Sequence, residues 1–237
     1  MIFHLYVFAI AASLTLCNGF VPNFFDAREK WPQCIGPIYD QAACNSSWAH
    51  AITSMMNDRY CIKSSSRSIE LSPQDLLCHM DSRCGGAFKV EEAFKKVEEV
   101  GVLTRKCWPY TADGMNCANE TCLDPQEKFE RHKCSIMQDH KNMTEVKIGI
   151  IERGPMICVF RETIDHKDYY DGVHYKAHTK PRYSFQTAVK LIGWGIENGM
   201  GYWIAEQSLG EGFGENGYVR YKAADDFCTV VYECDPQ

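Results

Sequence analysis

The sequence predicts an α+β fold in which a helical first half precedes a strand-rich second half. Up to about residue 152, apolar residues recur every three to four positions, as they do on one face of a helix. After Gly154-Pro155 the pattern changes to short apolar runs with many β-branched residues, which is typical of strands. With 237 residues and 45 % hydrophobic residues, the chain can form one well-packed domain with two lobes.

The first predicted helix begins near residue 46. Asn45 or Ser46 can cap its first turn, because the side-chain oxygen of either residue can accept a hydrogen bond from a free backbone amide. The apolar positions that follow are Trp48, Ala51, Ile52, Met55 and Met56. Their spacing places them on one face of the helix.

Three further helices are expected at residues 74–78, 88–100 and 144–152. The first of these follows Ser72-Pro73, a capping serine before a proline at the first helical position. The second ends at Gly101, because glycine readily adopts the left-handed backbone that closes many helices.

In the second half, strands are expected at residues 156–160, 188–194, 202–205 and 218–221. Asn198-Gly199 separates two of these strands and is a favoured sequence for a two-residue hairpin turn. We therefore expect a helical lobe over about residues 20–134 and a strand-rich lobe over about residues 135–237.

Residues 1–19 are expected to be a signal peptide, with a retained N-terminal anchor as the alternative. Their apolar run is shorter than the roughly 18–20 residues that span a bilayer, and small residues follow it. The predicted location is the extracellular space or a lysosome-like compartment. FVPNFFDAR comes directly after the signal, so we expect no propeptide. The net charge of −6 gives no basic surface for nucleic acid or anionic lipid, so neither is an expected partner. We also expect a monomer.

The thirteen cysteines fit the same secretory route. Cys17 leaves with the signal, and the remaining twelve suit a disulfide framework, with a stapled loop region at residues 107–134. No cluster of cysteine and histidine has zinc-ligand spacing, so neither a metal nor another cofactor is expected. Sequons predict N-glycosylation at Asn45, Asn119 and Asn142.

Eight blocks of sequence form an ordered set that spans nearly the whole chain after the signal. They are FDAREKWPQC, DQAACNSSWAHAI, DRYCI, CWPY, GPMICVF, LIGWGIENG, YWIA and GENGYVR. In this order they resemble the cathepsin B type of papain-like cysteine protease. The resemblance implies that the predicted α+β fold is the papain-like one, with a cleft between its two lobes.

The same resemblance identifies four active-site positions. Gln41 matches the glutamine that helps to form the oxyanion hole of the family. Ser47 stands at the position of the nucleophilic cysteine, and Thr187 at that of the general-base histidine. Gln207 stands at the position of the asparagine that orients the base, so only Gln41 is retained.

These residues do not suit the mechanism of the family, which needs a thiolate paired with an imidazolium. The hydroxyl of Ser47 needs a base within about 3 Å to remove its proton, and Thr187 has no basic nitrogen. The prediction is an inactive homologue that binds a peptide or extracellular protein, or a decoy that sequesters protease inhibitors. The alternative is a peptidase with a rewired serine nucleophile, Ser47, that uses His50, His174 or His178 as its base.

The resemblance also implies further cleft residues. Gly85-Gly86 resembles the glycine pair whose backbone binds substrate as an extra strand. Glu233 falls at the position of an acidic residue on the floor of the main specificity pocket. A glycan at Asn45 would stand at the mouth of the cleft, whereas a cramped loop around a bonded Cys44 would leave the sequon unoccupied; both alternatives stay open.

By resemblance the expected disulfides are Cys34–Cys61, Cys44–Cys84, Cys107–Cys134 and Cys117–Cys122. Of the other cysteines, Cys158 is expected to be a thiol in the core because it lies in an apolar strand. Cys228 with Cys234 can close a small loop, and Cys78 has no assigned partner.

Overall fold

The computed structural model of this protein describes most of the chain after residue 20. The described residues are 21–66, 69–80, 84, 90–113, 117, 121–138, 142–163, 172–174, 184–223 and 227–237. The predicted signal peptide lies outside them. Within these ranges, no helix has both the length and the apolar character that crossing a bilayer requires.

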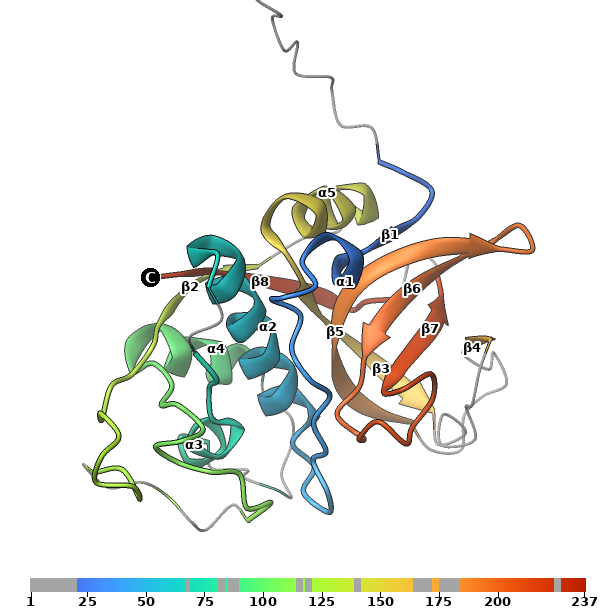
Figure 1. Cartoon of the computed structure of the whole chain (residues 1–237). Helices are drawn as coiled ribbons and strands as arrows, with labels where there is room; N and C mark the ends of the chain where they lie inside the picture. The colour runs from blue at the N-terminus through green and yellow to red at the C-terminus, as the bar shows by residue number, and fades with distance from the viewer. Residues whose placement is uncertain are drawn as a thin grey trace, which may run out of the picture.

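The first half folds into helices around one long central helix, as the apolar spacing predicts (Figure 1). These helices are α1 (Ala27–Lys30), α2 (Ser47–Ser64), α3 (Pro73–Cys78) and α4 (Val90–Glu99). Most residues of α2 are buried, because the helix packs against α3 on one side and against the sheet on the other. The helical first half and the sheet therefore meet at α2.

Capping agrees with the sequence at α3 but not at α2. Ser72 caps α3, since its hydroxyl accepts a hydrogen bond from the amide of Asp75 over 3.0 Å. Ser46 precedes α2, yet its side chain makes no capping hydrogen bond. Its hydroxyl lies instead 2.7 Å from the hydroxyl of Tyr110, so a tertiary contact replaces the predicted cap.

The second half supplies most of a mainly antiparallel sheet. Its strands are β1 (Phe25–Asp26), β2 (Cys134–Gln138), β3 (Met156–Thr163), β4 (Val173–His174), β5 (Ser184–Glu197), β6 (Met200–Glu206), β7 (Tyr218–Lys222) and β8 (Val230–Pro236). Over the described residues the order is β2-β8-β3-β5-β6-β7-β4, with β1 beside β5. All four predicted strands are present, and β1, β2, β4 and β8 are additional to them.

The hairpin between β5 and β6 forms at the predicted place. Asn198 and Gly199 have φ angles of 51° and 77°, the positive values that a tight hairpin turn of this kind requires. The register sets Trp194 opposite Trp203, and their rings pack edge to face with centroids 6.0 Å apart. This pair lies in the core of the strand-rich lobe.

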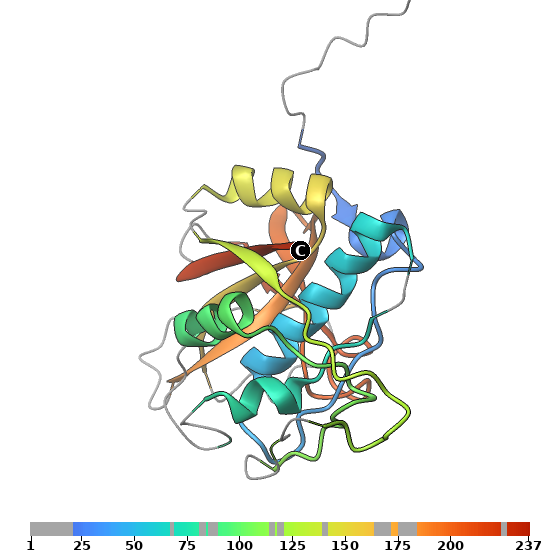
Figure 2. The same ribbon diagram turned by 90° about the vertical axis from the view of Figure 1, so that its left-hand side faces the viewer.

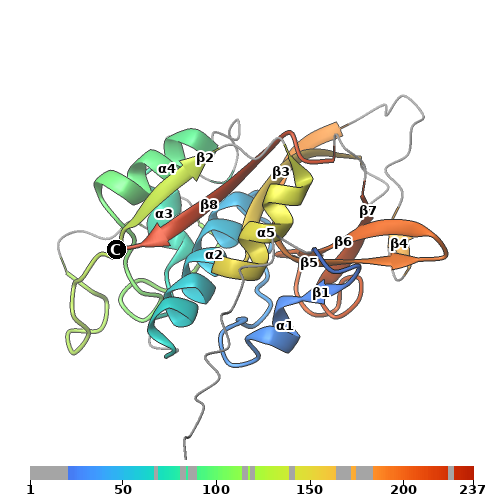
Figure 3. The same cartoon turned by 90° about the horizontal axis from the view of Figure 1, so that it is seen from above.

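The last strand crosses from the strand-rich lobe to the helical side, where it pairs with β2 (Figure 3). The ring of Tyr232 in β8 lies 4.6 Å from that of Phe94 in α4. Figure 2 shows β2 and β8 between α4 and helix α5 (Met143–Arg153). Residues of the C-terminal strand thus contribute to the core of the helical side.

Six disulfides join cysteines in the described part of the chain. They are Cys34–Cys61, Cys44–Cys84, Cys78–Cys117, Cys107–Cys122, Cys134–Cys234 and Cys158–Cys228. The first two are the expected pairs. The expected pairs Cys107–Cys134 and Cys117–Cys122 are wrong.

Backbone pairing explains the corrected disulfides. The amide of Leu123 donates to the carbonyl of Cys107, which holds residue 122 beside residue 107. The antiparallel pairing of β2 with β8 brings Cys134 and Cys234 to a Cα–Cα distance of 5.5 Å, within bonding range. Cys234 therefore does not close a small loop with Cys228, and Cys158 is not a free core thiol.

Candidate active site

Ser47 and Thr187 lie against each other in the structure. Ser47 is the first residue of α2, and Thr187 lies in β5. Thr187 Oγ1 donates a hydrogen bond to Ser47 Oγ over 3.3 Å, and the two residues are 4 % and 6 % exposed. Among the described residues, Thr187 is the one side chain that hydrogen-bonds to Ser47 Oγ. The contact joins two hydroxyl groups, neither of which is a base at neutral pH.

Gln41 and Gln207, the other two family positions, are held by different partners. Gln207 follows β6, and its amide nitrogen donates to the hydroxyl of Tyr221 over 2.6 Å. Gln41 is fixed twice by Ser208: its backbone amide donates to the carbonyl of Ser208 over 2.9 Å, and its side-chain oxygen accepts from the hydroxyl of Ser208 over 2.7 Å. The side-chain oxygen of Gln41 is thus engaged within the protein.

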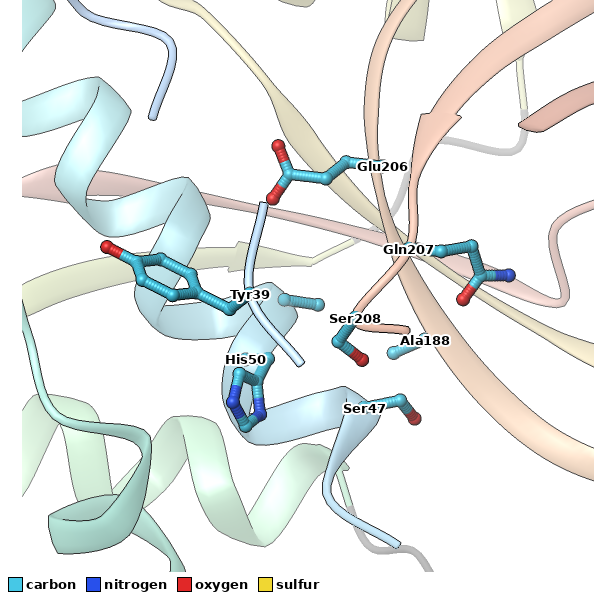
Figure 4. Close-up of a pocket in the computed structure, with 8 residues that line it drawn as sticks. Tyr39, Ser47, His50, Ala188, Glu206, Gln207 and Ser208 are labelled. Atoms are coloured by element: carbon cyan, nitrogen blue, oxygen red, sulfur yellow. The ribbon is translucent and has the colours of Figure 1, made fainter. Parts of the chain in front are cut away.

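A small cavity adjoins the pair between α2 and the end of β6 (Figure 4). Its lining residues are Tyr39, Ser47, His50, Ala51, Ala188, Glu206, Gln207 and Ser208. Its volume is about 10 Å³, which is the space of roughly one water molecule. Figure 4 shows the hydroxyl of Ser47 directed away from the ring of His50. Although Ser47 and His50 share this cavity, they are not a hydrogen-bonded pair in this structure.

A buried charge cluster ties the two elements of the site together. Lys190 of β5 is fully buried, and its Nζ lies 2.6 Å from Asp58 Oδ2 and 2.7 Å from Ser54 Oγ on α2. The same Nζ lies 2.7 Å from Glu206 Oε2 on β6. Two carboxylates thus share one ammonium group inside the protein. Lys190 stands three residues after Thr187, so the cluster fixes β5 against α2 beside the site.

The electrostatics of this cluster follow from its burial and its excess of acid. Burial is the largest cause that raises the pKa of Asp58, to about 6, with the charge of Lys190 opposing it and that of Glu206 adding to it. Burial acts to lower the pKa of Lys190, but the charges of Asp58 and Glu206 outweigh it and raise that pKa. The lysine is therefore held in its charged form.

Residues 21–235 match the model of a family described as papain family cysteine protease. The chain belongs to the papain family. It is 30 % identical over 239 residues to the cathepsin B-like cysteine proteinase 3 of Caenorhabditis elegans, a match that covers 89 % of this chain and 64 % of that protein.

Other papain-family proteins agree with this assignment. A gut-specific cysteine proteinase of the same nematode is 31 % identical over 241 residues, covering 89 % of this chain and 71 % of the relative. The solved structure of procathepsin B S9 from Trypanosoma congolense superposes with a TM-score of 0.83 at 27 % identity, covering 92 % of this chain and 79 % of the other. The α+β, papain-like fold is therefore established. The chain spans slightly less than two thirds of the first relative and more of the second.

Glu233 is buried away from the residues that line the cavity beside Ser47. It is 1 % exposed, and its carboxylate bonds to Arg59 over 3.0 Å and to Arg153 over 2.9 Å. Burial alone would raise its pKa, but the hydrogen bonds and charges of the two arginines outweigh burial and lower that pKa. Glu233 is a structural ion-pair residue that joins β8 to α2 and α5.

The remaining candidate residues lie in different surroundings. Gly85 and Gly86 are outside the described residues, as are Asn119 and His178, and the side chain of His174 is not described. Asn45 and Asn142 are both exposed. Asn142 also caps α5, because its side-chain oxygen accepts a hydrogen bond from the amide of Thr144 over 2.9 Å. In the described residues, no group of acidic, histidine and cysteine side chains is arranged to hold a metal.

Sequence reasoning missed the charge cluster of Lys190, Asp58 and Glu206. One signal was available: Lys190 interrupts the apolar run of a strand that is buried on both faces, and a lysine in such a place is seldom without a carboxylate partner. The partners themselves were hidden, since Asp58 lies more than a hundred residues away in the chain.

Proposed function

We propose that this chain is a secreted, cathepsin B-like member of the papain family that no longer cleaves peptides and acts by binding. The observation that supports this proposal is the hydroxyl–hydroxyl contact of Ser47 and Thr187 over 3.3 Å. Nucleophilic attack by a serine requires a base that takes its proton, and the threonine side chain offers none. A contact between two hydroxyl groups thus leaves Ser47 without the base that activation requires.

The expected loss of rate is large. Removal of the nucleophile or the base costs on the order of 10⁶-fold in a serine protease of another fold. In this chain the thiol and the imidazole are both replaced. Oxyanion stabilisation by Gln41 and the amide of Ser47 does not restore this loss, because in that serine protease the oxyanion hole and substrate binding alone leave only about 10³–10⁴-fold acceleration over water.

Reversion of the site tests this proposal. The triple variant Ser47→Cys, Thr187→His and Gln207→Asn restores the thiol, imidazole and amide of the family. We expect the wild type to leave unblocked peptides intact and the triple variant to cleave them. Ser47→Ala combined with the other two reversions is the matched control, since it lacks only the nucleophile. Cleavage by the wild type that disappears in the single variant Ser47→Ala would refute the loss of activity.

The proposed binding role concerns inhibitors of the cystatin type, peptides or an extracellular protein. Inhibitors that wedge into a papain-like cleft do not need the thiol, so this chain would act as a decoy that removes them from active proteases. Isothermal titration with a cystatin-type inhibitor measures this directly, and we expect binding by the wild type and by Ser47→Ala alike. No binding by either protein would exclude the decoy role but leave peptide binding to be measured in the same way.

Glycosylation at Asn45 is the modification that opposes the decoy role. Asn45 is exposed and precedes Ser47 by two residues, so a glycan there stands beside the site. Mass spectrometry of the glycopeptide measures its occupancy, with the Asn142 sequon as the internal reference. Inhibitor binding is expected only for the fraction of the protein without a glycan at Asn45.

A second candidate is a peptidase that uses Ser47 with a rewired base. The observation that favours it is that His50 lines the same cavity as Ser47. A fluorophosphonate probe reports an activated serine directly. Labelling of Ser47 in the wild type that is lost in His50→Gln would support this candidate, whereas absence of labelling between pH 4 and pH 9 would exclude it.

A further inference from the structure

The tripeptide Glu-Asn-Gly occurs twice in the chain, at residues 197–199 and 215–217. The first copy forms the turn between β5 and β6, and the second lies directly before β7. In both copies the backbone of the asparagine and the glycine is left-handed, with φ angles of 51° and 77° in the first and 56° and 87° in the second. Both asparagines are exposed. The two copies therefore differ mainly in what holds the glycine.

The peptide unit of Gly217 is held firmly. Gly217 is buried, and its N–H donates to the carbonyl of Phe213 over 2.7 Å, while its own carbonyl accepts from the amide of Gln207 over 2.9 Å. A Cβ atom at this glycine would lie 2.5 Å from Cγ2 of Ile38, so the backbone packs closely against that side chain. The amide nitrogen of Gly217 cannot move toward Asn216 unless these contacts break.

The peptide unit of Gly199 is open by comparison. Gly199 is exposed, and a Cβ atom at this glycine would have no neighbour within 4 Å. In the part of the chain that the structure describes, its N–H donates to no backbone carbonyl. The turn lies at the free end of the β5–β6 hairpin, away from the helices (Figure 1). Local opening of such an exposed tip breaks few contacts and costs little free energy.

An asparagine followed by glycine carries its own chemistry. The backbone nitrogen of the glycine can attack Cγ of the asparagine side chain, and glycine has no side chain to hinder the approach. A bond forms between this nitrogen and Cγ, the nitrogen loses its proton, and the bond between Cγ and Nδ2 breaks with release of ammonia. Water then opens the cyclic imide at either of its two carbonyls. The product is aspartate or isoaspartate, and no oxidant or reductant takes part.

We propose that Asn198 is a site of spontaneous deamidation and that its counterpart Asn216 is protected by the fold. Each conversion at Asn198 changes the net charge from −6 to −7. The new carboxylate stands next in the chain to Glu197, whose carboxylate accepts from Arg220 over 2.8 Å. Isoaspartate also inserts one carbon into the main chain of a two-residue turn, which the hairpin geometry does not accommodate without change.

Peptide mapping of the aged wild-type protein tests this proposal. The folded protein is kept at pH 7.4 and 37 °C, and mass spectrometry follows conversion at the two asparagines in the same samples. We expect Asn198 to convert at least about tenfold faster than Asn216, because the hydrogen bond of the Gly217 amide must first break. Equal rates, or faster conversion at Asn216, would overturn the proposal.

The unfolded chain is the matched control. After reduction and in urea, both Glu-Asn-Gly copies should convert at similar rates, since neither glycine amide is then held. If the folded protein showed no conversion at Asn198 over a time in which the unfolded chain converts, the proposal would also be wrong. Asn198→Gln should remove conversion at the hairpin and leave the slow conversion at Asn216 unchanged, because glutamine closes the larger ring much more slowly.

Discussion

Lys190 gives the sharpest test of how the structure holds its site together. In Lys190→Met the side chain keeps most of its length, but the buried ammonium is lost and the carboxylates of Asp58 and Glu206 face each other without a cation. Removal of one partner from a buried ion pair costs about 3–5 kcal/mol of unfolding free energy. For a chain of this length, that corresponds to a decrease in melting temperature of roughly 6–20 °C.

The loss should depend on pH in a defined direction. Without Lys190, the folded-state pKa of Asp58 rises further above its unfolded value, because burial and the charge of Glu206 both raise it and only the backbone hydrogen bond from Gly36 still opposes them. A raised folded-state pKa favours the folded protein at low pH, and this contribution is lost as the pH rises through that pKa. Urea unfolding of wild type and Lys190→Met at pH 4.5 and pH 7 should therefore show the larger difference in unfolding free energy at pH 7.

The double variant Lys190→Met and Asp58→Asn should recover part of the lost unfolding free energy at pH 7. A cost below about 1 kcal/mol, or an equal cost at both pH values, would refute the assigned role of the cluster.

Three further predictions concern other buried groups. Glu233→Gln should lower the unfolding free energy by about 3–5 kcal/mol, since Arg59 then has no buried counter-charge; a change within about 0.5 kcal/mol would count against the ion pair. Peptide mapping without reduction should recover a fragment that links Cys134 to Cys234, and a fragment that links Cys134 to another cysteine would contradict the structure. Burial lowers the pKa of His50 to about 4, so its contribution to stability is complete above pH 6.5 and decreases by about 3 kcal/mol as the pH falls to 4. Between pH 6.5 and pH 4, the unfolding free energy of the wild type should therefore fall by about 3 kcal/mol more than that of His50→Gln. Equal decreases in the two proteins would contradict the burial of a neutral imidazole.

Much of the fold follows from local sequence. The helices and strands have strong periodicity, and signals such as Ser72-Pro73 and Asn198-Gly199 mark where elements begin or turn. Strand β8 was missed because its register depends on β2 and β3, which lie far away in the chain. Cysteine pairing failed for the same reason. The partner of Cys134 is fixed by that long-range register, which no local pattern contains.

The candidate site was predictable in part. Alignment with the family placed Ser47 and Thr187 at matching positions, and the two side chains do contact each other. The same alignment assigned Glu233 to the floor of a specificity pocket, which stays a prediction. The ion pairs of Glu233 with Arg59 and Arg153 were not predictable from the sequence, because they depend on how distant elements pack together. The cavity at His50 was not predictable, because it depends on how side chains from α2 and β6 fill the space between them.

The central claim is that Ser47 is not a working nucleophile. The most direct measurement is the digestion of a complex mixture of unblocked peptides by the purified wild type and by Ser47→Ala, with mass spectrometry of the products across pH 4–9. We predict the same peptides, uncut, in both samples at every pH. Cleavage products that appear with the wild type and are absent with Ser47→Ala would contradict the account.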